Sequence, residues 1–179
     1  MITIYLKQFA LTGEFGPVKL GMSKTEVLAL LGKPDGDIDL GKAFSSLQYG
    51  WYEFFFIKKT GTLESIQNDH LQAQFTHGNR TINFKNDTFE IDPWFVKAGQ
   101  DISRKEVKNI LRAEGLSFAE EESGGSEIIR FDSGITLDFD NRDGEFFMNE
   151  AGEIEPDESV VIVEKEEFVL NGMRYFPTL

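Results

Sequence analysis

The stretch that decides the fold is Leu20–Gly36, "LGMSKTEVLALLGKPDG". Ser23 followed three residues later by Glu26 forms a capping box, in which each side chain satisfies a backbone N–H at the start of a helix. The apolar residues that follow at helical spacing are Val27, Leu30 and Leu31. Gly32 suits a left-handed helix terminus, and Pro34 prevents the helix from continuing. The stretch therefore predicts a helix of about ten residues with one apolar face.

The same pattern recurs in Ala98–Phe118, "AGQDISRKEVKNILRAEGLSF". Ser103 and Glu106 form a second capping box, displaced by 80 residues from the first. The apolar stripe that follows consists of Val107, Ile110 and Leu111. Further on, "FFFIKKTGTLESI" and "LDFDNRDGEFFMN" align at an offset of 83 residues, and both predict a strand, a turn with glycine and a second strand. These ordered recurrences predict a tandem repeat.

Unit one of this repeat is expected in residues 1–95 and unit two in residues 96–179. Each unit should contain a short helical pair on one face of an antiparallel sheet of about four strands, which places the chain in the α+β class. In unit one we expect an N-terminal strand in Ile2–Leu11 and a second helical turn near Lys42–Ser46. In unit two the acidic run Glu120–Glu127, "EEESGGSE", predicts a solvated loop.

The motif around the first helix resembles the small bacterial modules of the SmpA/OmlA (BamE) lipoproteins and of the β-lactamase-inhibitor-protein type. The residues that carry the resemblance are Gly21, Met22, Ser23, Glu26, Val27, Leu30, Leu31, Gly32 and Pro34. The second copy departs from the motif, with "LRAEG" where Gly-x-Pro is expected. The resemblance implies a fold and a non-enzymatic binding role, either as an assembly scaffold or as an inhibitor that grips a partner with a curved tandem sheet.

Composition narrows the possible functions. The chain has 179 residues and no cysteine, so it has no disulfide, thiolate metal site or cysteine nucleophile. The N-terminus lacks a basic segment followed by an apolar one, and no apolar run reaches membrane-spanning length, so we expect a cytoplasmic protein that does not enter a membrane.

The net charge of −13 lies wholly in the second half of the chain. Residues 1–89 hold nine Lys/Arg and nine Asp/Glu, whereas residues 90–179 hold nine and 22. Such a half should repel nucleic acid and attract a basic protein partner. Alternatively, the charge serves only to keep the protein in solution.

Aromatic residues fill both alternation phases of Tyr49–Lys59, "YGWYEFFFIKK". At the offset of 83, one phase (Tyr52, Phe54 and Phe56) matches Ile135, Leu137 and Phe139, and this phase is expected to form the core. The other phase should form an open sheet face, apolar in unit one and polar in unit two. Its candidate partner-binding residues are Trp51, Glu53, Phe55, Ile57, Thr136, Asp138 and Asp140. Alternatively, the N-terminal strand or residues 81–96 cover Trp51 and Phe55.

Two further sets of residues share only part of the pattern of a metal-binding or catalytic site. Asp138–Phe146 shares Asp-x-Asp and Asp-Gly with a calcium loop, but Arg142 occupies the fifth position, where the EF-hand pattern requires a ligand. His70 and His77, the only histidines, are expected on the surface. We therefore expect no metal, no cofactor and no catalytic residue.

The leading hypothesis is a non-enzymatic module of the immunity or inhibitor type that neutralises a basic partner through the open sheet face. An envelope or assembly scaffold of the SmpA/OmlA type is the alternative. A small-ligand binder or enzyme that uses His70 or His77 is a further one.

Overall fold

The computed structural model describes residues 1–75, 82–123, 126–141, 146–148, 154–156 and 161–175. An antiparallel sheet of eight strands dominates it, in the spatial order β2-β3-β4-β5-β12-β9-β8-β7. The first four strands in this order are β2 (Gly36–Leu40), β3 (Phe44–Tyr49), β4 (Tyr52–Ile57) and β5 (Thr62–Asn68). The other four are β12 (Val169–Tyr175), β9 (Ile135–Asp140), β8 (Ser126–Arg130) and β7 (Ala119–Ser123). The predicted α+β class is confirmed.

Both predicted helices are present with their N-terminal caps, whereas Gly32 at the end of the first has a ψ of −156° and is not in the left-handed helical conformation that was expected. The two helices are α2 (Lys24–Leu31) and α3 (Arg104–Ala113), and in each the capping box closes in both directions. Because each box satisfies backbone N–H groups that have no partner within the helix, it determines where the helix begins.

The N-terminal segment differs from the expected single strand. It forms a short strand, β1 (Ile2–Tyr5), followed at once by a helix, α1 (Leu6–Thr12). Leu6, Phe9 and Ala10 are buried at helical spacing, and this stripe favours a helix against the core. β1 pairs in parallel with β6 (Phe89–Asp92), away from the large sheet.

The prediction of a helical turn near Lys42–Ser46 is wrong. Gly41 has a φ of 85° and turns the chain between β2 and β3, and β3 begins at Phe44. Period-two alternation explains the strand, because Leu47 and Tyr49 are buried on one face while Phe44 is exposed on the other.

The strand that lies beside β9 also differs from the prediction. Residues 145–149 were expected to follow β9 as the next strand of its sheet. Instead β10 (Phe146–Met148) pairs with β11 (Ile154–Pro156) in a separate two-stranded sheet, and β12 lies beside β9. β12 also pairs with β5, so one sheet of eight strands takes the place of the two sheets of about four strands that were expected.

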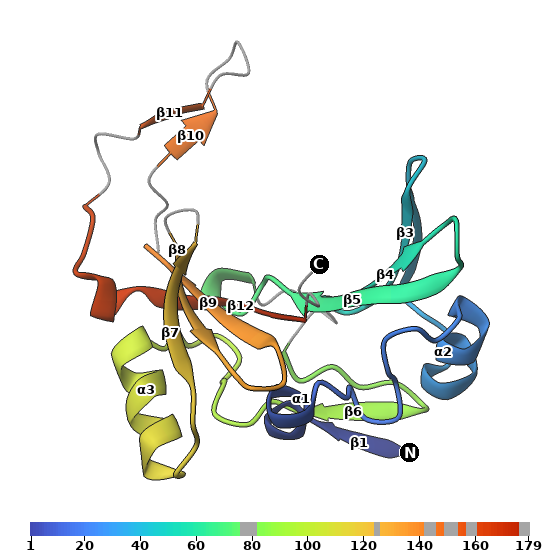
Figure 1. Ribbon diagram of the computed structural model, residues 1–179, viewed down its shortest axis with the longest axis horizontal. Coiled ribbons are helices and arrows are strands. Elements are labelled where there is room, and N and C mark those ends of the chain that lie inside the picture. Colours follow the sequence, from blue (N-terminus) through green and yellow to red (C-terminus); the bar gives the residue numbers. More distant parts are fainter. Residues whose placement is uncertain (76–81, 124–125, 142–145, 149–153, 157–160, 176–179) are drawn as a thin grey trace.

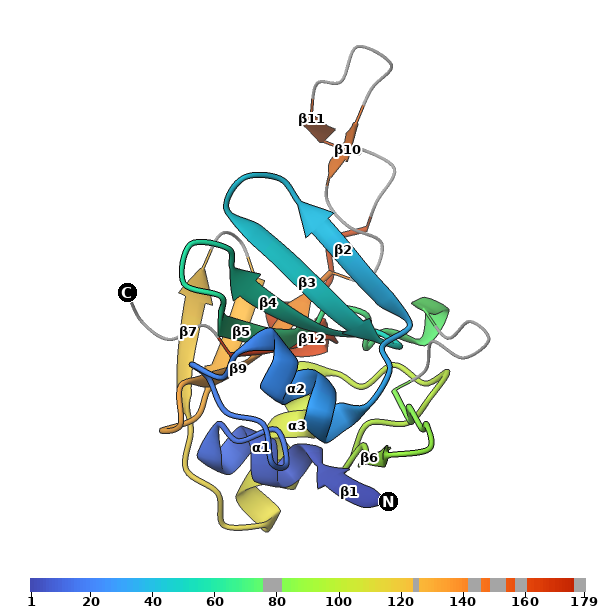
Figure 2. The same ribbon diagram turned by 90° about the vertical axis from the view of Figure 1, so that its right-hand side faces the viewer.

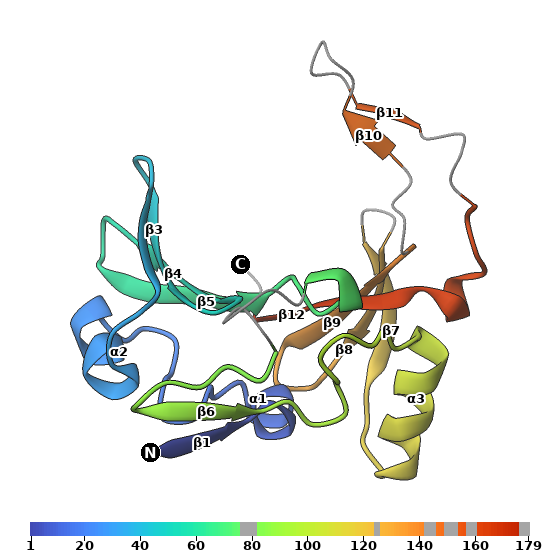
Figure 3. The same ribbon diagram turned by 180° about the vertical axis from the view of Figure 1, so that it is seen from behind.

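The core lies on one side of this sheet. Figures 1 and 3 show the helices and the β1–β6 pair on that side, and the β10–β11 hairpin projecting from the other side. The described 3-10 turns are η1 (Ala73–Phe75) and η2 (Lys165–Glu167). None of the helices in the described ranges is long and apolar enough to cross a membrane.

Candidate functional site

The alternation of β4 sorts the aromatic strand into two faces. Tyr52, Phe54 and Phe56 are buried in the core, which confirms the phase predicted from the repeat. The residues of the opposite phase, Trp51, Glu53, Phe55 and Ile57, are all partly exposed. The sheet face opposite the helices, called here the open face, is therefore accessible at β4.

Apolar side chains gather on the open face of β2, β3 and β4. In the strand register, Leu40 lies opposite Phe44 and Phe44 opposite Ile57, while Ile38 and Phe55 flank Ser46. The exposed fractions of Ile38, Leu40 and Phe44 are 36%, 45% and 41%. We call the set of Ile38, Leu40, Phe44, Phe55 and Ile57 the apolar patch.

The edge strand β2 turns its apolar side chains away from the core. Asp37 and Asp39 alternate with Ile38 and Leu40, and they form ion pairs with Lys24 on α2 and with Lys58. Figure 2 shows β2 at the edge of the sheet, with α2 below it in that view. An edge strand built only for burial would place its charges outward. The reversed pattern makes the apolar side of β2 part of the open face.

A polar row borders the apolar patch. Glu53 lies between Gln48 and Gln67 on the neighbouring strands, and the two amide groups donate to its two carboxylate oxygens at 2.8 and 2.9 Å. No Lys or Arg among the described residues forms an ion pair with Glu53. The strand pairs thus hold a carboxylate in a fixed orientation beside Phe55.

Trp51 lies directly before β4 and is partly covered. Its indole stacks on the imidazole of His70 with 3.8 Å between the ring centroids, and its Nε1 donates to the Phe75 carbonyl at 2.7 Å. These contacts come from the segment after β5, which holds both His70 and Phe75. His70 is half-buried in this stack, and His77 lies outside the described residues.

The expectation of an exposed polar face on β9 is wrong for two of its three residues. Thr136 and Asp138 are buried, and only Asp140 is partly exposed. Asp138 is buried because Arg174 of β12 lies against it, with Arg174 Nε 2.8 Å from Asp138 Oδ2 and 2.7 Å from Asp69 Oδ1. Gly172 makes room, since a Cβ there would lie 3.0 Å from a carboxylate oxygen of each aspartate.

Two carboxylates, those of Asp69 and Asp138, thus share one guanidinium where the two halves of the sheet meet, and Asp140 lies near them. Asp140 accepts hydrogen bonds from Ser126 and Asn171. Burial raises the pKa of Asp138 to about 6; Arg174 opposes the rise, while Asp69 and Asp140 add to it. In the unfolded chain the carboxyl has its ordinary pKa of about 3.9.

This pKa difference predicts a pH-dependent stability. Because the folded state holds the Asp138 proton more tightly, its contribution to stability is complete below about pH 4 and is lost as the pH rises through about 6. Asp138→Asn should remove this component and reduce the stability difference between pH 4 and 7 by about 2–3 kcal/mol. Urea unfolding at several pH values measures it. Asp132→Asn, at an exposed aspartate, is the control, and an equal change in both variants would contradict the assignment.

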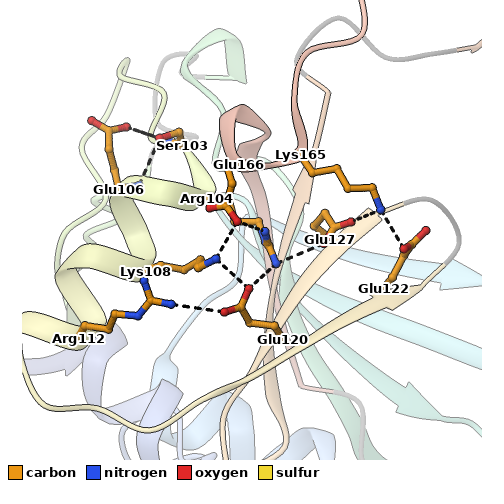
Figure 4. Close-up of polar contacts among 10 residues, drawn as sticks. All are labelled: Ser103, Arg104, Glu106, Lys108, Arg112, Glu120, Glu122, Glu127, Lys165 and Glu166. Carbon is orange, nitrogen blue, oxygen red and sulfur yellow. Dashed lines mark hydrogen bonds and ion pairs between the residues drawn. The ribbon is translucent and has the colours of Figure 1, made fainter.

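The acidic run Glu120–Glu127 is not a solvated loop in its described part. Ala119–Ser123 form β7, and Ser126 and Glu127 begin β8. Figure 4 shows the reason: carboxylates of this run face α3 and meet its cations. Glu120 Oε2 lies 2.6 Å from Arg104 and 2.8 Å from Lys108, and Glu166 Oε1 lies 2.7 Å from each. This ion network is a structural contact between α3, β7 and η2. It neutralises part of the acidic charge that we expected to attract a basic partner.

The described residues offer little that suggests catalysis or metal binding. They contain no group of three or more His, Asp or Glu side chains placed to hold a metal ion. His70 does not line the pocket of about 460 Å³ beside α3, whose lining residues are Phe95, Lys97, Gln100, Asp101, Ile102, Glu106, Asn109 and Ile110. The open face is therefore the better candidate site.

Sequence and structure together define an α+β protein with an open, partly apolar sheet face. No protein-family model, curated protein or solved structure matches the chain.

Proposed function

We propose that the chain is a tandem repeat of two helix-plus-sheet units, as the resemblance to the SmpA/OmlA and β-lactamase-inhibitor-protein modules implies. The strand order supports this, because β2-β3-β4-β5 and β7-β8-β9-β12 are each a meander that follows a capped helix. The two cap serines also form equivalent bridges, Ser23 with Thr62 of β5 and Ser103 with Val169 of β12.

Irregularities in the last strand of each meander support the repeat further. β5 has a register shift between Leu63 and Ser65, and β12 has one between Leu170 and Gly172. Both lie opposite the matching aromatic residues Phe56 and Phe139. A β-bulge at one equivalent position in both strands is difficult to ascribe to chance, since bulges are local departures from the ladder.

We infer that the open face binds another protein and that the chain is a non-enzymatic inhibitor or immunity-type module. The apolar patch carries this proposal, because contiguous exposed aromatic and aliphatic side chains mark protein interfaces. Glu53 adds a fixed carboxylate at the border of the patch, which suits a lysine or arginine of a basic partner. The net charge of −13 would steer such a partner to the protein.

Photocrosslinking in the source cell tests this proposal. A photoreactive phenylalanine analogue at Phe44 or Phe55 should capture one and the same protein. Tyr5, an exposed aromatic residue on β1, is the matched control position and should not capture it. Capture should weaken at high salt and with Glu53→Gln, because charge contributes to the association. Capture equal at all three positions, or absent at both Phe44 and Phe55, would argue against the open face.

The scaffold alternative involves the same face and differs in the partner, which would then be an envelope protein. The identity of the crosslinked protein separates the two. The ligand-binder or enzyme alternative has less support, because His70 stacks on Trp51 instead of lining the pocket beside α3.

A further inference from the structure

Unit two contains an insertion that unit one lacks. In unit one, four residues, Lys58–Gly61, connect β4 to β5, whereas 28 residues, Asn141–Phe168, connect β9 to β12. Unit one forms its four strands of the sheet without such a segment, so the fold does not require an insertion of this length. Insertions of this kind in repeat proteins frequently carry binding functions.

The insertion contains an exposed run of strand-forming residues, Val161–Val163. The exposed fractions of Val161, Ile162 and Val163 are 75%, 63% and 40%. Three consecutive β-branched side chains strongly favour a strand. Within the part of the chain that the structure describes, however, no strand pairs with this run.

One side of the run is held by the side chain of Asn141. Its amide donates to the Val161 carbonyl at 3.4 Å and accepts from the Val163 N–H at 3.3 Å. These are the two groups that a neighbouring strand would engage on that side. In an extended chain the N–H and C=O of Ile162 point to the opposite side. Neither makes a hydrogen bond to another described residue, so both are available to an added strand, although the run itself is not a strand in the structure.

The charge of the insertion indicates which kind of strand can add there. Asn141–Phe168 contains ten Asp/Glu and two Lys/Arg, so 10 − 2 = 8 of the 13 net negative charges lie in this segment. Glu164 and Glu167 are exposed directly after the run. Pairing between two copies of the chain would bring these carboxylates together, and like charges oppose it. A strand with lysine or arginine side chains would complement them.

We propose that Val161–Val163 is the docking site for an extended segment of a basic partner protein. The segment adds as a strand along Ile162, buries apolar side chains against the run, and places its cations near the exposed carboxylates of Glu164 and Glu167. This surface is separate from the apolar patch, so it can act whether or not the open face binds a protein.

A synthetic peptide of about nine residues that alternates lysine and valine is the probe. Binding to the full chain is measured by fluorescence anisotropy, and strand addition by slowed amide hydrogen exchange at Ile162. Two control peptides separate the contributions: one has glutamate in place of lysine, and the other has N-methylated alternate amides. We expect the N-methylated peptide to bind about tenfold more weakly or worse, because it keeps the charges but cannot pair as a strand.

Variants locate the binding. Val161→Ser with Ile162→Ser should weaken the lysine–valine peptide about tenfold or more, because two exposed side chains that become buried on docking are removed. Leu40→Ser with Phe44→Ser, which alters the apolar patch at similar exposure, should leave peptide binding unchanged. If the N-methylated peptide binds equally well, or the Val161/Ile162 variant keeps full affinity, the attraction is only electrostatic and the docking site is overturned. Peptide binding lost only in the patch variant would overturn it as well.

Discussion

Arg104→Met is expected to destabilise the protein by about 3–5 kcal/mol, the cost typical of removing one partner from a buried ion group. The Arg104 side chain is only 7% exposed and lies within 3.3 Å of carboxylate oxygens of Glu120, Glu127 and Glu166. Methionine retains most of the apolar stem but removes the guanidinium. The carboxylate of Glu127, itself 8% exposed, would then lose one of its two cations without gaining water.

Arg112→Met provides the matched control on the same helix. The Arg112 side chain is 58% exposed and lies 3.5 Å from Glu120, so its removal should change the free energy of unfolding by at most about 0.5 kcal/mol. Urea unfolding of both variants measures the difference. Pairing Arg104→Met with Glu127→Gln should recover part of the loss, because the buried charge is then also removed. Equal, small effects of the two arginine variants would show that the network does not hold α3 to the sheet.

The same network explains why β7 could not be predicted from its own residues. "AEEES" has low strand propensity and high charge, and by local rules it indicates a loop. Its carboxylates become tolerable in a strand because Glu120 faces Arg104, 16 residues earlier, and Glu122 faces Lys165, 43 residues later. The proposed unit one has a weaker counterpart in the more exposed pair of Lys24 and Asp37. Such pairings depend on tertiary contacts that no local pattern encodes.

The candidate site was predictable to the extent that it depends on alternation. The two faces of β4 follow from period two, and the alignment of the two proposed units assigned the core face correctly. The alternation of residues along a strand cannot indicate which other segments cover a face of the sheet. Asp138 is buried by Arg174, which is 36 residues away, and β12 itself returns to the sheet only after the long insertion. The exposed apolar residues of β2 were missed, although the alternation of "GDIDL" contained the signal.

Phe54→Ala and Phe55→Ala should separate the fold from the proposed function. Phe54 is fully buried and packs edge-on against Phe15 and Tyr49, with ring centroids 5.3 and 5.5 Å apart. Removing its ring leaves a cavity in the core, and a loss of about 3–5 kcal/mol is expected in the free energy of unfolding. For a small domain, a loss of this size is a large fraction of the total stability.

Phe55, the next residue, should behave in the opposite way. Its ring lies on the open face between Ser46 and Ser65, where alanine leaves no enclosed cavity, so the expected loss of stability is about 1 kcal/mol. Because anchor residues at the centre of an interface each contribute about 2 kcal/mol or more, association with the crosslinked partner should weaken by more than tenfold. Urea unfolding and titration with that partner measure the two quantities. If Phe55→Ala costs as much stability as Phe54→Ala and leaves binding intact, the aromatic residues of both phases stabilise the fold. The open face would then not be the interface.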